Sequence, residues 1–161
     1  MLVAGVGNVL RGDDGFGPAV IAALEREGGL SDGVRLVELG IGGVGLVHEL
    51  LAGYDALVVV DAVEQGGPPG ALYVIEPVLA VADCSVGATD MHGAVPARAL
   101  VLARALGALP PFVRVVGCQP AETEALSLEL SPVVRRAVPA AVEAVRALLR
   151  EVEEAVTWQP A

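Results

Sequence analysis

MLVAGVGNVLRGDDGFG, residues 1–17, gives the clearest indication of how this chain folds. Met1–Val6 is a short apolar run that ends among glycines, which is typical of a buried first strand. Gly15–Glu27 follows with apolar residues at i, i+4 and i+8, the spacing of one helical face. Asp13 and Asp14 stand between them, where an N-cap and a first-turn acid belong. This succession of strand, glycine-rich turn and helix predicts the first unit of an α/β fold.

The remainder of the chain repeats the alternation of short β-rich runs and longer helical ones. Ala56–Ala62 is a continuous apolar run containing one acid near its end, which indicates a central parallel strand. Residues 77–91 have no period and are expected to form a long excursion, a kind of segment that is more often functional than idle. Residues 119–130 are expected to be irregular, and Ser131 with Pro132 to open the last helix as N-cap and first turn. The other expected elements are strands at Val34–Leu39, Ala71–Ile75 and Val113–Gly117, and helices at Leu46–Ala52 and His92–Leu106.

Length and composition agree with this pattern. The 161 residues fit one domain, expected over 1–161 with 157–161 as a frayed tail. Hydrophobic residues make up 54% of the chain and aromatic ones only 3%, so the core must be built from aliphatic side chains. Twenty glycines and eleven prolines indicate many tight connections. They favour a wound α/β sheet over a helical bundle.

The charge and the cysteines exclude several classes of protein. A formal net charge of -10 should repel both phosphate backbones and anionic lipid, so no nucleic acid or membrane partner is expected. Cys84 and Cys118 are far apart and form no CxxC pattern, which argues against a disulfide framework or structural zinc and suits a reducing cytoplasm. The first residues carry no basic stretch before the apolar ones, so no signal peptide is expected. The apolar run Ala56–Val63 is too short to span a bilayer.

Two carboxylates are candidates for a functional site. Asp14 lies at the turn after the first expected strand, although Asp13 and Asp14 could instead simply cap the coming helix. Asp61 lies near the end of a buried parallel strand, where open α/β sheets place their ligands, although it could also be a solvated strand-end acid.

His92 is the third candidate, because it stands where the long excursion enters a helix. Asp90 could orient its ring through the second nitrogen, or could cap the helix. The other histidine, His48, falls within a short helix and is expected to be structural or solvated. Asp14, Asp61 and His92 all fall at connections that a parallel sheet gathers on one edge, and two carboxylates with one imidazole would suit a borderline transition metal with open coordination positions.

Common catalytic and nucleotide-binding motifs are absent. The sequence has no GxSxG, no HExxH and no GxxxxGK[ST]. Gly5 and Gly7 invite a dinucleotide reading, but Leu10 occupies the position of the third glycine and no helix is expected directly behind the pair. Adjacent aspartates at the helix N-terminus would also oppose a pyrophosphate. A nucleotide-binding protein therefore remains only a secondary alternative.

The order of motifs resembles that of the hydrogenase maturation endopeptidases, over nearly the whole chain. The opening motif is the most specific of these, and the others are weak singly. The segments that carry the resemblance are Gly5–Leu10 with Asp13–Gly17, Val58–Ala62, Thr89–His92, Gly117–Pro120 and Leu130–Pro132.

The resemblance implies a wound sheet of about five mostly parallel strands with helices on both faces. It implies an endopeptidase that removes a C-terminal extension from the large-subunit precursor of a [NiFe]-hydrogenase after nickel insertion. By position, Asp14, Asp61 and His92 would be the catalytic and metal-contacting residues, and many family members have Glu where Asp14 stands. The turn Gly40–Gly45 matches a family loop that contacts substrate. The nickel would be held by the precursor, so no permanently bound metal of the enzyme's own is expected.

Two catalytic schemes and two further functions stay open. A metal could polarise the scissile carbonyl and activate water, or it could only dock the substrate while Asp14 or Asp61 acts as general base. A non-proteolytic nickel-delivery or hydrogenase-assembly chaperone could use the same three ligands, and a related peptidase could act on another protein.

Overall fold

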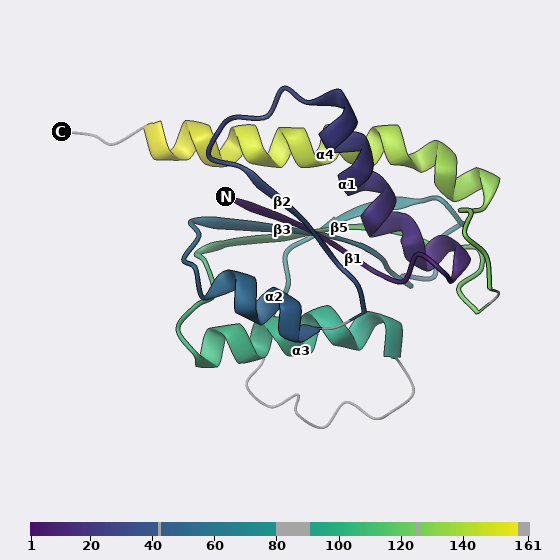
Figure 1. Ribbon diagram of the computed structural model, residues 1–161, viewed down its shortest axis with the longest axis horizontal. Coiled ribbons are helices and arrows are strands. Elements are labelled where there is room, and N and C mark those ends of the chain that lie inside the picture. The colour runs from purple at the N-terminus through teal and green to yellow at the C-terminus, as the bar shows by residue number, and fades with distance from the viewer. Residues whose placement is uncertain (42, 80–90, 125, 158–161) are drawn as a thin grey trace.

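The computed structural model of the chain describes residues 1–41, 43–79, 91–124 and 126–157, apart from the side chains of 91–95 and 156–157. Strands and helices alternate along it as the sequence predicts (Figure 1). In chain order the elements are β1 (Leu2–Val6), the 3-10 turn η1 (Gly12–Gly15), α1 (Phe16–Glu27), β2 (Arg35–Leu39), α2 (Gly43–Leu50), β3 (Ala56–Ala62), β4 (Leu72–Ile75), α3 (Met91–Ala105), β5 (Phe112–Cys118) and α4 (Pro132–Thr157).

One sheet of five strands runs in the order β2-β1-β3-β5-β4. The first four strands are parallel, and β4 pairs antiparallel with β5 at the edge. The α/β class and the mostly parallel sheet are therefore confirmed, as is the central place of β3. The four parallel strands end on the same side of the sheet, which we call the carboxyl edge.

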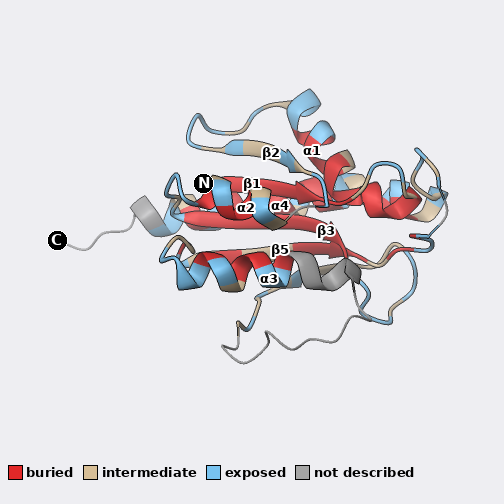
Figure 2. Ribbon diagram, turned by 60° about the horizontal axis from the view of Figure 1, so that its bottom comes forward, coloured by how far each residue is buried: buried red, intermediate tan, exposed pale blue. Residues whose placement is uncertain are grey.

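Helices cover both faces of the sheet, α1 and α4 on one side and α2 and α3 on the other (Figure 1). Strand β3 is buried along its whole length (Figure 2). Its side chains alternate between the faces, because successive residues of a strand point to opposite sides. Val58 and Val60 pack under α1 and α4, whereas Leu57 and Val59 pack under α2 and α3. By the same alternation Asp61 belongs to the face covered by α2 and α3.

Glycines in the opening motif permit close approaches of the backbone. A Cβ on Gly17 would collide with the carbonyl oxygens of Val6 and Val60, at the ends of β1 and β3. Gly7 has φ +138, and a Cβ there would collide with the carbonyl oxygen of Asp14. These two glycines allow η1 and the first turn of α1 to lie directly against the carboxyl edge, as Figure 1 shows.

Two predicted features near the ends of helices need correction. Asp13 and Asp14 do not cap α1, because they lie inside η1, and the N-cap of α1 is Gly15 without a side-chain hydrogen bond. The second helix begins at Gly43 and ends at Leu50, three residues earlier at its start than the apolar pattern predicts, because the glycine-rich turn itself becomes helical.

Other boundaries agree with the prediction. Gly28 ends α1 with φ +64, and its N–H donates to the carbonyl of Leu24. Ser131 caps α4 by accepting from the N–H of Val134 at 3.4 Å. Helix α4 continues to Thr157, one residue into the expected frayed tail, and residues 158–161 lie outside the described part of the chain. Most of the expected excursion, residues 80–90, lies outside it too.

Candidate active site

The carboxylate of Asp14 lies at the carboxyl edge, just beyond β1. Asp14 belongs to η1 and is only 6% exposed. Oδ2 accepts a hydrogen bond from the N–H of Asn8 at 3.0 Å, and the N–H of Asp14 donates to the carbonyl of Arg11. The turn 8–14 is thus folded back on itself, and Asp14 is fixed both through its backbone and through its side chain.

Asp61 is the penultimate residue of β3 and is 3% exposed. Its partner on the neighbouring strand β5 is Gly117, which has no side chain beside the Asp61 carboxyl. Burial raises the pKa of the Asp61 carboxyl well above its usual range, and the negative charge of Asp14 raises it further. The hydrogen bond from the N–H of Ala62 acts in the opposite direction. The influence of Asp14 means that the structure brings these two predicted site residues together.

A buried pair of carboxylates of this kind binds cations readily. Two like charges that share one desolvated place repel, so one of them tends to hold a proton. A cation or a proton placed between them relieves the repulsion. The pair can therefore act as two oxygen ligands for a metal ion, or as an acid and a base that share one proton.

His92 lies in the first turn of α3, and its side chain is outside the described residues. The position of its backbone follows from the topology. Helix α3 leads into β5 through residues 106–111, so the helix ends at the amino edge of the sheet and begins toward the carboxyl edge. It packs on the face to which Asp61 belongs. The three predicted residues therefore share one edge, but only Asp14 and Asp61 can be related through their side chains.

Asp13 has a role that the sequence does not reveal. It is 1% exposed, and its carboxylate accepts four hydrogen bonds from three residues beyond β5. The donors are Ala121 N at 2.8 Å and Glu122 N at 3.1 Å to Oδ2, Ser131 Oγ at 2.9 Å to Oδ2, and Ser131 N at 2.7 Å to Oδ1. The prediction that Asp13 caps α1 is therefore wrong. Its carboxylate binds the segment before α4 and not the N-terminus of α1.

Backbone bonds reinforce the same junction. Gly12 N donates to Ser127 O at 2.8 Å and Ser127 N donates to Leu10 O at 3.0 Å, which makes a short parallel bridge between Arg11 and Ser127. The sequence did hold a signal for this junction, because Gly117–Pro120 and Leu130–Pro132 were two of the segments that carried the family resemblance. The residues that Asp13 contacts follow the first segment or lie in the second.

Cys118 and Gln119 follow the same strand but have different surroundings. The Cys118 thiol is buried, and burial raises its pKa from 9.0 to about 11, with the charge of Asp13 adding to the rise. A thiol with this pKa stays protonated near neutral pH and is a poor nucleophile. Gln119 accepts from Gln65 N at 2.8 Å through Oε1 and also pairs by its backbone with Gly70 and Ala71, so it fixes the loop after β3. Cys84 lies outside the described residues.

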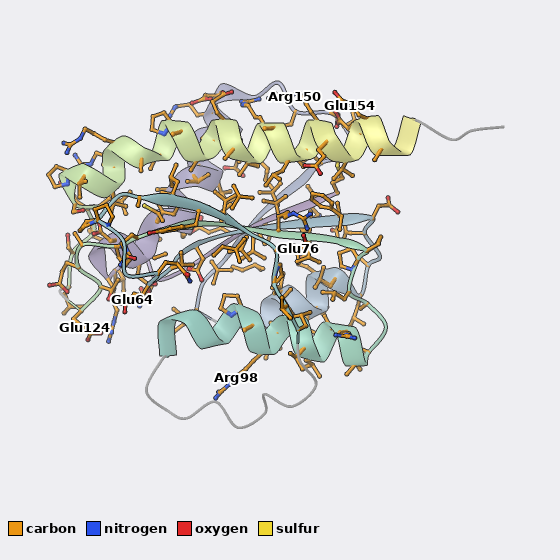
Figure 3. The ribbon with its side chains drawn as sticks, turned by 180° about the vertical axis from the view of Figure 1, so that it is seen from behind. Glu64, Glu76, Arg98, Glu124, Arg150 and Glu154 are labelled. Carbon is orange, nitrogen blue, oxygen red and sulfur yellow. The ribbon has the colours of Figure 1, made fainter. Side chains whose placement is uncertain are left out.

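Charged side chains around this edge are mainly acidic. Figure 3 shows Glu64 and Glu124 at the side of the sheet where β3 and β5 end, whereas Arg150 and Arg98 lie on the outer sides of α4 and α3. Arg11 makes a 3.7 Å ion pair with Glu124, in which both side chains are well exposed. The edge that carries Asp14 and Asp61 therefore presents negative charge, which suits a cationic ligand.

The donor set can be compared with what a metal needs. Within the described residues, no group of three or more His, Cys, Asp or Glu side chains is placed to hold a metal ion. Two buried carboxylates alone make an incomplete coordination shell, since transition-metal sites take more ligands. The residues fit a site that contributes two oxygens and receives other ligands from elsewhere.

The motif after β1 does not form a dinucleotide-binding turn. Helix α1 begins at Phe16, well beyond Gly7, and η1 stands between them. The N–H of Asn8, which would face a phosphate, donates to Asp14.

Comparison with known proteins gives one consistent result. The family model for hydrogenase maturation proteases matches residues 18–148. A hydrogenase expression/formation protein HupD from Rhizobium leguminosarum bv. viciae is 32% identical over 160 residues, which cover 99% of this chain and 79% of the relative. A hydrogenase expression/formation protein HoxM from Cupriavidus necator is 36% identical over 151 residues, which cover 93% of this chain and 74% of the relative.

Solved structures agree with the sequence comparison. The hydrogenase maturating endopeptidase HybD from E. coli superposes with a TM-score of 0.82 at 31% identity, covering 94% of this chain and 92% of that one. A hydrogenase 2 maturation peptidase from a Thaumarchaeota archaeon gives a TM-score of 0.65 at 35% identity, covering 92% of this chain and 96% of that one. Among the helices of the described residues, none has the length and apolar character needed to cross a membrane.

Proposed function

The chain belongs to the hydrogenase maturation protease family and is a peptidase, and from this premise we propose that it removes the C-terminal extension of a nickel-loaded [NiFe]-hydrogenase large-subunit precursor. In this proposal Asp14, Asp61 and His92 recognise the nickel that the precursor already holds. The precursor is thus both the partner and the substrate. The expected place of action is the cytoplasm.

The observation that carries the proposal is the buried pair formed by Asp14 and Asp61. Two carboxylates that lie together out of water repel each other, and this repulsion opposes the ionisation of both. A cation delivered by the substrate would relieve this repulsion, and the two carboxylates would add two oxygen ligands to its shell. The pair is therefore a means of testing whether the precursor is loaded.

The reaction itself consumes one water molecule and moves one of its protons to the leaving amine. The water oxygen attacks the scissile carbonyl carbon, the C–N bond breaks, and the proton from the water ends on the leaving amine. Asp61, whose pKa is raised by burial and by the charge of Asp14, would take up that proton from the water and pass it to the amine. Nickel on the precursor would draw charge from the carbonyl when it lies beside the bond. His92 is proposed as the third contact, at the start of α3.

The decisive experiment compares two preparations of the same precursor, one loaded with nickel and one not. The purified chain is incubated with each, and intact mass is measured. Loss of a C-terminal peptide from the loaded precursor alone supports the proposal. Unchanged mass of the loaded precursor, with a stable complex on gel filtration, would instead indicate the assembly chaperone. Equal cleavage of both preparations would remove nickel recognition from the proposal and leave a peptidase of another specificity.

A further inference from the structure

We propose that Asp13 is a positioning residue of this peptidase, which holds Asp14 toward Asp61 by fastening η1 to the segment Gln119–Ser131. The part of the inference that concerns catalysis rests on the proposed function. The part that concerns the orientation of Asp14 does not. Asp13 touches neither substrate nor metal in this view, and acts only through its neighbour in the chain.

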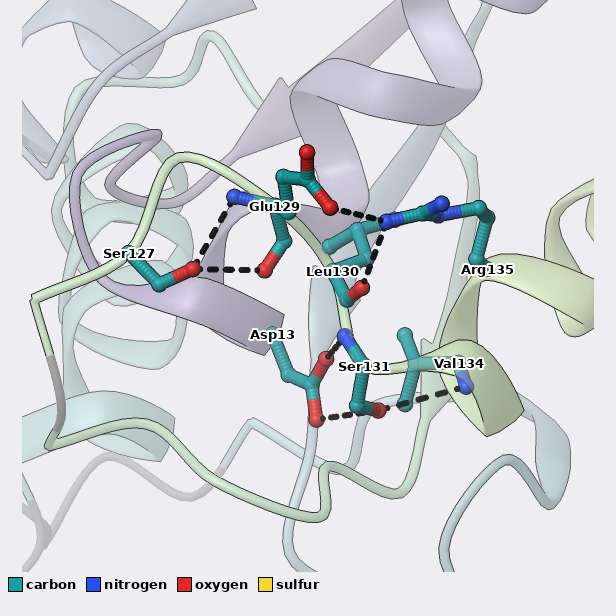
Figure 4. Close-up of polar contacts among 7 residues, drawn as sticks. All are labelled: Asp13, Ser127, Glu129, Leu130, Ser131, Val134 and Arg135. Carbon is teal, nitrogen blue, oxygen red and sulfur yellow. Dashed lines mark hydrogen bonds and ion pairs between the residues drawn. The ribbon is translucent and has the colours of Figure 1, made fainter.

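The carboxylate of Asp13 joins three separate pieces of the chain. It belongs to η1, it accepts from Ala121 and Glu122 just after β5, and it accepts from Ser131 at the start of α4. Figure 4 shows both bonds to Ser131, together with the bond from Val134 to the Ser131 hydroxyl. Asp13 thus fixes the position of the N-cap of α4 as well as the loop that precedes it.

The character of these bonds makes them strong and directional. A carboxylate that is 1% exposed must have its charge stabilised by the protein. Within the described residues the hydrogen bonds to the Asp13 carboxylate come from four neutral donor groups, and the N-terminus of α4 adds the positive end of its dipole. Hydrogen bonds to an ionised group are shorter and about twice as strong as neutral ones.

The connection from Asp13 to Asp14 is covalent and short. The N–H of Asp13 also donates to the carbonyl of Glu122 at 3.1 Å, so both the backbone and the side chain of Asp13 are bound to one dipeptide. With Asp13 held in this way, Asp14 can turn only within the freedom of one residue. Its carboxylate then meets the N–H of Asn8 on one side, and the Asp61 carboxyl lies near enough to feel its charge.

The variant Asp13→Asn tests this role with almost no change of shape. Three donors converge on Oδ2 and one, the N–H of Ser131, on Oδ1. An asparagine whose amide oxygen takes the place of Oδ2 keeps the three bonds there. Its NH2 group then takes the place of Oδ1 and faces the N–H of Ser131, so that two donors oppose each other. Ser131→Ala removes one bond, and Ser131→Thr restores the hydroxyl. Val142→Ala, on the buried side of α4 and away from the site, serves as a control for lost stability.

Two readouts separate positioning from stability. The first is the exchange rate of the Asn8 amide hydrogen, which is bonded to Asp14 and needs no substrate. The second is steady-state cleavage of loaded precursor, well below the Tm of every variant. Because a displacement of about 1 Å can lower a rate by about 100-fold, we expect kcat of Asp13→Asn to fall by about that factor. KM should change by less than about threefold, since substrate contacts remain.

The expected pattern is faster Asn8 exchange and lower kcat in Asp13→Asn, a smaller loss in Ser131→Ala that Ser131→Thr largely restores, and wild-type values of both readouts in Val142→Ala. Unchanged Asn8 exchange in Asp13→Asn would overturn the proposal, as would a kcat loss no larger than that of Val142→Ala at matched Tm. Should Asp13→Asn fail to fold, the Ser131 pair decides by the same two measurements. If wild type leaves the precursor uncleaved, the proposed function fails while Asn8 exchange still decides the orientation of Asp14.

Discussion

The carboxylate of Asp14 lies close enough to the Asp61 carboxyl to raise its pKa, in addition to the larger rise that burial causes. The two residues belong to different elements, η1 and β3, and are 6% and 3% exposed. Glycines let these elements approach, and Asp13 fastens one of them in place. The fold therefore maintains an unfavourable arrangement of charge at one edge of its sheet, and sites of this kind are commonly functional.

This arrangement predicts that Asp61→Asn stabilises the protein while it abolishes cleavage. The folded chain binds the Asp61 proton more tightly than the unfolded chain, in which the pKa of an Asp is about 3.9. The free energy of unfolding therefore falls as pH rises from the unfolded pKa through the folded one, and the cost of ionised Asp61 is fully present above both. Removing the charge should raise Tm near pH 8 by about 2–4 °C, the shift that ~1 kcal/mol gives in a domain of this size.

Thermal melts of wild type and Asp61→Asn at several pH values check this prediction. The difference in Tm should shrink toward zero as pH is lowered below about 4, where Asp61 is protonated in both states. A variant that melts lower than wild type near pH 8 would mean that Asp61 is stabilised by its surroundings and not strained by them.

The two histidines form a matched pair for testing the site. His92→Ala should lower cleavage of loaded precursor by at least about 100-fold, the scale of a lost acid–base or electrostatic contact. His48→Ala should leave cleavage close to wild type, because His48 is exposed on α2 and no contact of its side chain joins it to the carboxyl edge within the described residues. Initial rates and circular dichroism of both variants are the measurements. Equal activity of both would take His92 out of the proposed site.

Close packing of the opening motif predicts a strong effect of Gly17→Ala. The new Cβ would press on two backbone carbonyl oxygens, those of Val6 and Val60, which cannot rotate away as a side chain could. Overpacking of this kind costs about 3 kcal/mol, so Tm should fall by about 6–12 °C. Gly33→Ala is the control, because nothing lies within 4 Å of its Cβ and its φ is not positive. A Tm of Gly17→Ala equal to that of the control would show that α1 can move away from the sheet.

The surroundings of Cys118 predict that it takes no part in the chemistry. With its pKa raised to about 11 by burial and by Asp13, the thiol stays protonated up to pH 9 or so and reacts slowly with iodoacetamide. Cys118→Ser should keep cleavage within about threefold of wild type, a smaller effect than loss of a nucleophile would cause. Mass spectrometry after alkylation, beside the cleavage assay, decides. Rapid labelling of Cys118 with parallel loss of activity would favour a Cys–His mechanism instead.

The sequence predicted β3 and α4 well, because β3 is a continuous apolar run and α4 carries a long apolar stripe of helical period. It failed at η1, since a 3-10 turn of four residues has no period of its own and an aspartate before a helix resembles a cap. The partner of Asp13 is 118 residues away at Ser131, and no local pattern can reveal a bond over that distance. The nearness of Asp14 and Asp61 was predictable, because the parallel order of β1 and β3 brings their ends together.

Metal dependence is the prediction that separates the two mechanisms still open. Asp14 and Asp61 supply two oxygens and His92 is proposed as a third contact, which leaves the coordination shell open, so the purified protein should bind nickel or zinc only weakly. Ligands from the precursor would complete the shell, and affinity should then appear only in the complex. Treating the enzyme alone with a chelator, which is then removed, should leave cleavage of loaded precursor intact. Removing the metal from the precursor should abolish cleavage.

Metal analysis of each separated protein, beside the cleavage assay, is the measurement. An equimolar, tightly bound metal in the isolated enzyme, whose removal stops cleavage of loaded precursor, would contradict substrate-borne recognition and assign the ion to the enzyme as its own catalytic group.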